Sequence, residues 1–147
     1  MTENKIHSIL PGSGFHEIIT TTVKINPSRY NLRRLRKVNH IKISIFKRGC
    51  ELVAGIRVVS DKDSLYVLDV YVTQAHRKKG YATYLIAKAC KLSRRKYGAT
   101  IIELDDMSNH AWKDDNVYKK MGFKYMNPYP ECEMRASVRT ILSKCSK

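Results

Sequence analysis

The chain is 147 residues long, with 28 Lys and Arg against 13 Asp and Glu, which gives a formal net charge of +15. This length predicts a single domain over residues 1–147, with a core of about 16–138, and excludes a second domain of ordinary size. The charge favours acidic partners, either a ligand with several phosphate groups or a nucleic acid.

The four cysteines, Cys50, Cys90, Cys132 and Cys145, include no Cys-x-x-Cys pair and have no histidine at ligand spacing. We therefore expect free thiols, and neither a metal site nor a disulfide framework. The N-terminus is not followed by an apolar core of signal-peptide length, and no stretch approaches ~18 consecutive apolar residues. These features predict a protein of the cytoplasm, or of the nucleus in a eukaryotic host, that is neither secreted nor bound to a membrane.

The first part of the chain is expected to hold a strand and then a helix. Residues 16–25 are rich in Ile, Thr and Val, which is typical of a strand. Asn26 and Pro27 form an N-cap signal, and Leu and Val side chains follow at helical spacing up to Val38. Basic residues between 29 and 37 occupy the rest of this predicted helix. They form either a solvated polar face or a contact surface for nucleic acid.

Antiparallel strands are predicted next. Residues 41–45 alternate Ile with polar side chains, residues 52–59 form an apolar run, and a turn at 47–50 joins them into a hairpin. After another turn, the apolar, β-branched and aromatic run 65–72 reads as a buried strand. The three strands 41–45, 52–59 and 65–72 are thus expected to run antiparallel in succession.

A strand, helix, strand crossover follows. The helix is expected from about Gly80 to Gly98, because its small and apolar residues fall on one face and Gly98 stands in the usual C-terminal position. Residues 100–104 return as a strand parallel to the strand that ends at Val72. Beyond it we expect a short helix at 112–120 and strand character at 122–125.

The remaining chain is simpler. Residues 127–130 form a turn and residues 131–138 a last strand, and the tail to Lys147 is expected to be a basic end that frays.

A basic loop connects the strand ending at Val72 to the helix. Arg77, Lys78 and Lys79 supply three cations, and Gly80 lets the backbone approach a ligand closely. The free N–H groups and the dipole of the first helical turn favour an anion at the same place. The spacing fits neither a Walker loop nor a dinucleotide fingerprint, so the sequence predicts either a phosphate-binding loop of another kind or a basic surface loop that caps an ordinary helix.

Two motifs carry a resemblance to a known family. The spacing Arg77-x-x-Gly80-x-Ala82 resembles the Gln/Arg-x-x-Gly-x-Gly/Ala signature of the GNAT superfamily of acyl-CoA N-acyltransferases. The run Tyr118-x-x-x-Gly122-Phe123 resembles the Tyr-x-x-x-Gly-Phe signature that ends the family's fourth helix. The two motifs stand in the family's order and are separated by a predicted strand.

The resemblance implies a single α/β domain with a mixed, mostly antiparallel sheet flanked by helices. Its fourth and fifth strands splay apart, and acyl-CoA is held between them. Val70 and Val72 are implied to offer backbone groups to the pantetheine arm, and Asn109 to lie near it, although Asn109 is separated from Tyr118 by nine residues where the family commonly has seven. Asn109 is equally well read as a helix N-cap. The residues implied to bind the pyrophosphate are Arg77, Lys78, Lys79, Gly80, Tyr81, Ala82 and Thr83.

The implied chemistry needs a proton donor and a base. The resemblance places Tyr118 near the thioester sulfur, and a phenol with an ordinary pKa near 10 can protonate a thiolate of ~8.5 with only a small uphill step. The attacking amine must arrive neutral, which calls for a base or a bound water. Asp69 on the central strand and Glu103 on its neighbour are the candidate bases, and either carboxylate could instead serve structure.

The family resemblance implies transfer of an acetyl group from acetyl-CoA to a primary amine by direct attack in a ternary complex, with no metal. The charge leaves two alternatives open: a basic module that binds nucleic acid or the ribosome on the same fold, or an acetyltransferase whose acceptor amine is borne on a nucleic acid. The class of amine and the presence of a homodimer are left open by the sequence.

Overall fold

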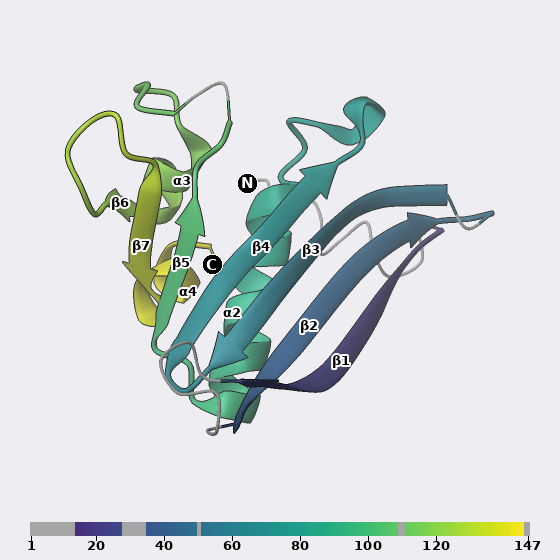
Figure 1. Ribbon diagram of the computed structural model, residues 1–147. Coiled ribbons are helices and arrows are strands. Elements are labelled where there is room, and N and C mark those ends of the chain that lie inside the picture. Colours follow the sequence, from purple (N-terminus) through teal and green to yellow (C-terminus); the bar gives the residue numbers. More distant parts are fainter. Residues whose placement is uncertain (1–13, 28–34, 50, 109–110, 146–147) are drawn as a thin grey trace.

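The computed structural model describes residues 14–27, 35–49, 51–108 and 111–145, with the backbone alone for 24–27 and 35–37. A seven-stranded sheet runs in the order β1-β2-β3-β4-β5-β7-β6 (Figure 1). Its strands are β1 (Phe15–Pro27), β2 (Leu35–Lys47), β3 (Glu51–Asp61), β4 (Ser64–Val72), β5 (Ile101–Asp105), β6 (Lys124–Tyr125) and β7 (Glu133–Ser137). The helices are the 3₁₀ helix η1 (Gln74–His76), α2 (Tyr81–Tyr97), α3 (Val117–Met121) and α4 (Val138–Cys145).

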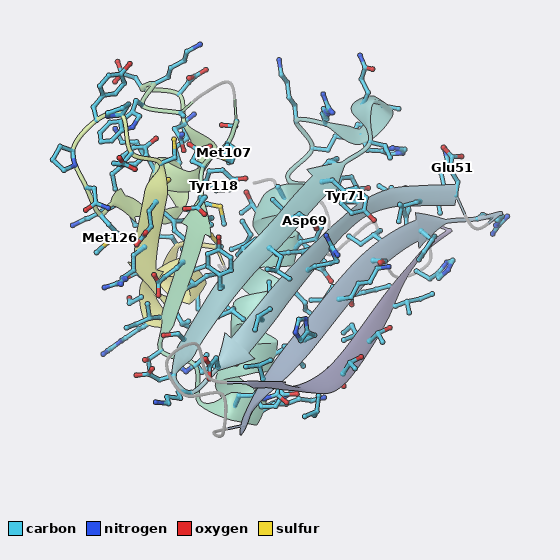
Figure 2. All side chains as sticks on the ribbon, viewed as in Figure 1. Glu51, Asp69, Tyr71, Met107, Tyr118 and Met126 are labelled. Carbon is cyan, nitrogen blue, oxygen red and sulfur yellow. The ribbon has the colours of Figure 1, made fainter. Side chains whose placement is uncertain are left out.

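The predicted fold class is confirmed. Every neighbouring pair of strands is antiparallel except β4 and β5, which run parallel on either side of the crossover through α2. The helix α2 lies against one face of the sheet, and Asp69 and Tyr71 of β4 lie on the face turned away from it (Figure 2). Within the part of the chain that the structure describes, no helix is both long and apolar enough to cross a membrane.

The helix expected from Asn26 to Val38 is wrong at both of its ends, which are strand. The strands β1 and β2 form one long antiparallel hairpin that pairs Phe15 with Lys47 at one end and Pro27 with Leu35 at the other. Val38, which the helical spacing placed on a helix face, is a buried residue of β2. Cross-strand pairing along the whole hairpin outweighs the local N-cap and proline signals. Residues 28–34, and the side chains of the basic stretch 29–37, lie outside the described part.

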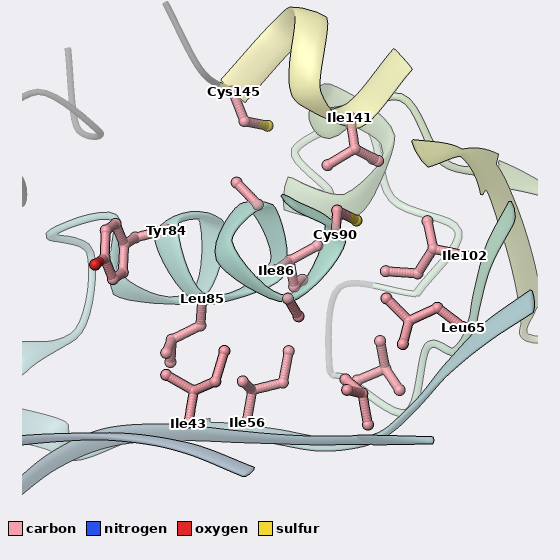
Figure 3. Close-up of a cluster of buried hydrophobic side chains, with 14 of the residues drawn as sticks. Ile43, Ile56, Leu65, Tyr84, Leu85, Ile86, Cys90, Ile102, Ile141 and Cys145 are labelled. Carbon is pink, nitrogen blue, oxygen red and sulfur yellow. The ribbon is translucent and has the colours of Figure 1, made fainter. Parts of the chain in front are cut away.

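The core is built where α2 crosses the sheet. Figure 3 shows Ile43 and Ile56 of the sheet against Leu85 of α2, and all three side chains have no exposed surface. The helix ends as predicted, because Gly98 has a φ of 71° and its N–H donates to the Arg94 carbonyl. A left-handed residue at this place is strained for any side chain with a Cβ.

The C-terminal tail is not a frayed end, which corrects a second prediction. It forms α4, which lies on the side of α2 opposite the sheet, and Val138, Ile141 and Cys145 are buried there (Figure 3). The helix starts with a cap, because the Ser137 hydroxyl accepts a hydrogen bond from the Thr140 N–H at 3.0 Å. The spacing of three and four residues between the buried side chains is that of one helical face.

Ile141 tests whether this tail belongs to the folded core. Ile141→Ala removes a fully buried side chain, so we expect the free energy of unfolding to fall by about 2–5 kcal/mol. Arg139→Ala, at an exposed position of the same helix, is the matched control and should change it by less than ~0.5 kcal/mol. Equal, small losses in urea unfolding of the two variants would mean that α4 adds nothing to the core.

Candidate functional site

The candidate site begins where β4 and β5 part. Residues 64–66 of β4 pair with residues 101–103 of β5, and the ladder ends there. A register shift in the pairing of β3 with β4 falls at the next residues of β4, so that Arg57 faces Asp69 while Val58 faces Val67. An irregularity of this kind bends and twists a strand. Beyond residue 66 the two strands diverge (Figure 1).

A hydrogen bond marks the point of divergence. The Tyr66 hydroxyl donates to Asp105 Oδ2 at 2.7 Å and so links β4 to β5 at the last paired position. This bond, together with burial and the charge of Asp105, raises the pKa of Tyr66 to about 12. Tyr66 therefore remains a donor at neutral pH, and the bond fixes where the opening starts.

The opening between β4 and β5 forms a pocket of about 310 Å³. Three of the predicted site residues, Asp69, Val70 and Tyr118, line it together. Asp69 comes from the face of β4 that is turned away from α2, whereas Tyr118 comes from α3 on the far side of the opening, beside Met107 (Figure 2). The structure thus brings a carboxylate and a phenol to one cavity from positions 49 residues apart in the sequence.

The carboxylate of Asp69 is held on one side only. Its Oδ2 accepts hydrogen bonds from Arg57, from Nε at 2.8 Å and from a terminal nitrogen. Its Oδ1 is buried and has no hydrogen-bond partner among the described residues. A buried acceptor without a partner is costly, and it is satisfied when a donor arrives. Glu103 does not line the pocket, and its carboxylate instead accepts from Arg135 at 3.4 Å.

Tyr118 is positioned by the turn that ends α3. Gly122 has a φ of 115°, and the Phe123 N–H donates to the Tyr118 carbonyl at 3.0 Å, so the chain reverses directly after the helix. The Phe123 ring then meets the Tyr118 ring edge to face, with centroids 6.0 Å apart. Burial first, and the charge of Asp106 second, raise the pKa of the Tyr118 phenol. The phenol is therefore protonated at neutral pH, and its proton transfer to a thiolate is more uphill than that of an ordinary phenol.

The predicted phosphate-binding loop lies at the other end of α2 from Gly98. Gly80 caps the helix with a φ of 87°, and the first helical bond runs from the Tyr84 N–H to the Gly80 carbonyl at 3.0 Å. The N–H groups of residues 81–83 precede that bond and lack helical partners. Arg77 is drawn back onto the preceding strand, because its Nε donates to the Val72 carbonyl at 3.2 Å.

A second pocket, of about 340 Å³, opens at this loop. Lys78, Gly80 and Thr83 line it from the loop and the first turn of α2. Lys120 of α3 and Lys144 of α4 line it from the other side. The sequence did not identify these two lysines, because the pattern of a phosphate loop is local and α4 was not foreseen. The arrangement gathers three ammonium groups beside a helix N-terminus, which suits a polyphosphate.

The remaining predicted residues are placed as follows. The Tyr81 side chain is buried, and its ring lies beside those of Phe15 and His76, so only its backbone can face a ligand. Lys79 is exposed, Ala82 is half-buried, and Asn109 lies outside the described residues.

Two further features concern structure more than ligand binding. The predicted helix at 112–120 starts only at Val117, because Trp112 has a left-handed φ of 62° and its ring stacks on that of Tyr125 with centroids 3.7 Å apart. Among the described residues, no group of three His, Cys, Asp or Glu side chains could hold a metal ion.

Comparison with known proteins finds one family model and several solved structures that resemble this chain. A family model described as acetyltransferase (GNAT) family matches residues 15–123. A solved structure of the PaiA N-acetyltransferase from Thermoplasma acidophilum, in complex with coenzyme A, is 18% identical with a TM-score of 0.56, and the match covers 67% of this chain and 60% of that one. Tetrahymena GCN5 is also 18% identical, with a TM-score of 0.55, over 67% of this chain and 68% of that one.

A nourseothricin acetyltransferase matches over more of the chain. It is 18% identical with a TM-score of 0.53, and the match covers 92% of this chain and 94% of that one. At these identities the solved structures establish the shared fold. The chain spans less than two thirds of the length of the Thermoplasma protein. No curated protein sequence is similar enough to this chain to be matched with it.

Proposed function

Because this chain belongs to the acetyltransferase (GNAT) family, we propose that it transfers an acetyl group from acetyl-CoA to a primary amine within a ternary complex. The observation that carries the proposal is the pocket between β4 and β5, which both Asp69 and Tyr118 line. A cationic pocket stands at the N-terminus of the helix that follows β4. A long ligand with phosphates at one end and a reactive group at the other suits both.

The coenzyme is held mainly by backbone groups in this proposal. The pantetheine arm lies along β4 in the opening and hydrogen-bonds to the backbone at Val70 and Val72. The pyrophosphate sits on the loop from Arg77 to Thr83, where the helix N–H groups and Lys78 face it. Lys120 and Lys144 add positive charge on the opposite wall of that pocket.

The transfer needs three proton movements. The amine nitrogen attacks the thioester carbonyl carbon after Asp69 Oδ1, directly or through a water, has taken a proton from the ammonium. The C–S bond then breaks, and the departing thiolate takes the proton of the Tyr118 hydroxyl. The nitrogen of the new amide gives up its second proton, which passes through water and restores the Tyr118 phenol. Asp69 is a better candidate than Glu103 because it lines the same pocket as Tyr118 and keeps one oxygen without a partner among the described residues.

An amine borne on an acidic macromolecule is the second candidate acceptor. The net charge of +15 repels free polyamines and attracts nucleic acids or acidic proteins by its long-range field. The same charge fits a basic module that binds nucleic acid without catalysis. A measurement of turnover distinguishes the catalytic function from the non-catalytic one, because only an enzyme converts acetyl-CoA and an amine into products.

A panel of acceptors tests the proposed reaction directly. Acetyl-CoA is mixed with the protein and with an aminoglycoside, a polyamine, an amino acid, a peptide with a free N-terminus or an aminoacyl-RNA, and release of the free thiol is followed. We expect protein-dependent release with at least one amine, accompanied by an acetylated product. If acetyl-CoA does not bind and no amine reacts, while nucleic acid binds in a salt-dependent way, the non-catalytic alternative is correct.

Substitutions at Gly80 and Gly98, the two glycines that cap α2, distinguish a loss of coenzyme binding from an effect of backbone strain. Gly80→Ala and Gly98→Ala each place a Cβ on a left-handed residue, so each should cost about 1–2 kcal/mol of stability. Only Gly80 lies in the proposed pyrophosphate site, so Gly80→Ala should weaken acetyl-CoA binding about tenfold or more and Gly98→Ala should leave it unchanged. Equal affinities in calorimetric titrations of both variants would remove the pyrophosphate from this loop.

The acid and the base should respond to pH in opposite ways. Tyr118→Phe and Asp69→Asn should each lower kcat at pH 7, by about 10²- to 10⁴-fold for a full general-acid or general-base role. A rise in pH toward the ordinary amine pKa of ~10 supplies neutral amine without a base. It should therefore restore the kcat of Asp69→Asn but not the kcat of Tyr118→Phe. Tyr129→Phe, an exposed tyrosine, is the control. Turnover of Tyr118→Phe within about threefold of the parent would show that the hydroxyl is dispensable.

A further inference from the structure

Two fully buried polar side chains stand behind Tyr118 and have no part in the proposed chemistry. Asp106, directly after β5, and Asn116, directly before α3, are both 0% exposed. A carboxylate without any exposed surface is rare in proteins unless its oxygens are fully hydrogen-bonded. Their partners show what the two residues do.

From the residues that the structure describes, Asp106 accepts four hydrogen bonds, two on each oxygen. Oδ1 accepts from the N–H and the hydroxyl of Ser108, at 3.0 and 2.6 Å. Oδ2 accepts from Asn116 Nδ2 at 2.5 Å and from the Tyr125 hydroxyl at 3.3 Å. The backbone of Asp106 is also fixed, because its N–H donates to the Cys132 carbonyl at 2.9 Å. Asp106 is thus a rigid point at the end of β5.

Asn116 connects that point to α3. Its Oδ1 accepts from the backbone N–H groups of Tyr118 and Lys119, at 2.8 and 3.2 Å. Since these N–H groups can only donate, the amide oxygen must face the helix and the amide nitrogen must face Asp106. One orientation of the amide satisfies both sides. The contact therefore runs from Asp106 through Asn116 to the backbone of Tyr118 itself.

The helix that carries Tyr118 depends on such an anchor. The helix α3 has five residues, which is far below the length at which a helix is stable alone. Its C-terminal end is tied by the reversal at Gly122, and its N-terminal end is capped by Asn116. A loss of the link to Asp106 would let the cap turn and the first helical turn shift.

We propose that Asp106 and Asn116 are positioning residues, which hold the Tyr118 hydroxyl at the thioester sulfur by fixing the first turn of α3 to the end of β5. This inference rests on the proposed function, in which Tyr118 is the acid. A displacement of about 1 Å of a reacting group can cost on the order of 10²-fold in rate, so a hydrogen-bonded link remote from the sulfur controls kcat. Neither residue lines the pocket at the coenzyme loop, to which α3 contributes only part of one wall, so we expect the link to affect acetyl-CoA affinity much less than kcat.

An exchange of the two side chains tests the link. In Asp106→Asn the new amide cannot satisfy the Ser108 N–H and the Asn116 amide nitrogen as the two carboxylate oxygens do. In Asn116→Asp the cap on α3 is kept, but the second oxygen faces the carboxylate of Asp106. In the double variant every role can be filled again, because the Tyr125 hydroxyl, 3.5 Å from the Asn116 amide nitrogen in the parent, can donate to the new carboxylate at position 116. The new amide at position 106 turns its oxygen to Ser108, and its nitrogen donates to the new carboxylate at position 116.

The measured quantity is kcat with acetyl-CoA and the most reactive amine of the panel. The rate is divided by the concentration of acetyl-CoA-binding sites, so that unfolded molecules are not counted. We expect each single variant to lose about 10- to 100-fold in kcat, with acetyl-CoA affinity within about twofold of the parent. The double variant should recover to within about threefold. Ser137→Ala, which removes the cap of α4, is the control for a lost helix cap and should keep the parental kcat.

Three results would overturn the inference, and they are distinct. If Tyr118→Phe lowers kcat but both single variants keep it within about threefold, Asp106 and Asn116 do not position the phenol, and the proposed function stands. If Tyr118→Phe itself keeps the parental kcat, the acid assignment fails and this inference fails with it. A double variant that melts like the parent but stays as slow as the single variants would also overturn it.

Discussion

The shortness of the parallel ladder between β4 and β5 is the constraint on which the rest depends. Only three residues of each strand are paired, and the register shift in β4 then turns that strand away from β5. Had the ladder continued, backbone hydrogen bonds would close the space in which Asp69 and Tyr118 meet. The Tyr66 hydroxyl fixes the point of separation by its bond to Asp105. The pocket is therefore a consequence of strand pairing that stops early.

Charge is divided along this opening. The end at the N-terminus of α2 gathers lysines from three segments, Lys78, Lys120 and Lys144. The end between the strands instead has the carboxylates of Asp69 and Asp105 on its wall. Phosphates are attracted to the first end and an ammonium group to the second, and in the proposed function this difference orients the coenzyme and the amine before any specific contact forms. The strong positive charge of the chain is thus compatible with the proposed acceptor site beside Asp69 and Asp105.

Most of the fold could be predicted because its signals are local. The glycine after the basic loop, the alternation of the central strands and the Gly98 cap each lie within a few residues of the element they define. The long β1–β2 hairpin and α4 could not be predicted in the same way. Cross-strand pairing overrides the Pro27 signal, and α4 gains its stability from burial of Ile141 on α2. For the candidate site, short motifs predicted Gly80 and Tyr118, whereas the links of Asp106 and Asn116 depend on tertiary hydrogen bonds that no spacing reveals.

The most direct test of the account is a crystal structure of the protein with coenzyme A. The account predicts that the pantetheine arm lies between β4 and β5 with its amides bonded to the backbone near Val70, and that the sulfur lies within hydrogen-bond reach of the Tyr118 hydroxyl. The phosphates should rest on the loop at Gly80. Coenzyme bound elsewhere, or in this opening with its sulfur turned away from Tyr118, would contradict the central claim.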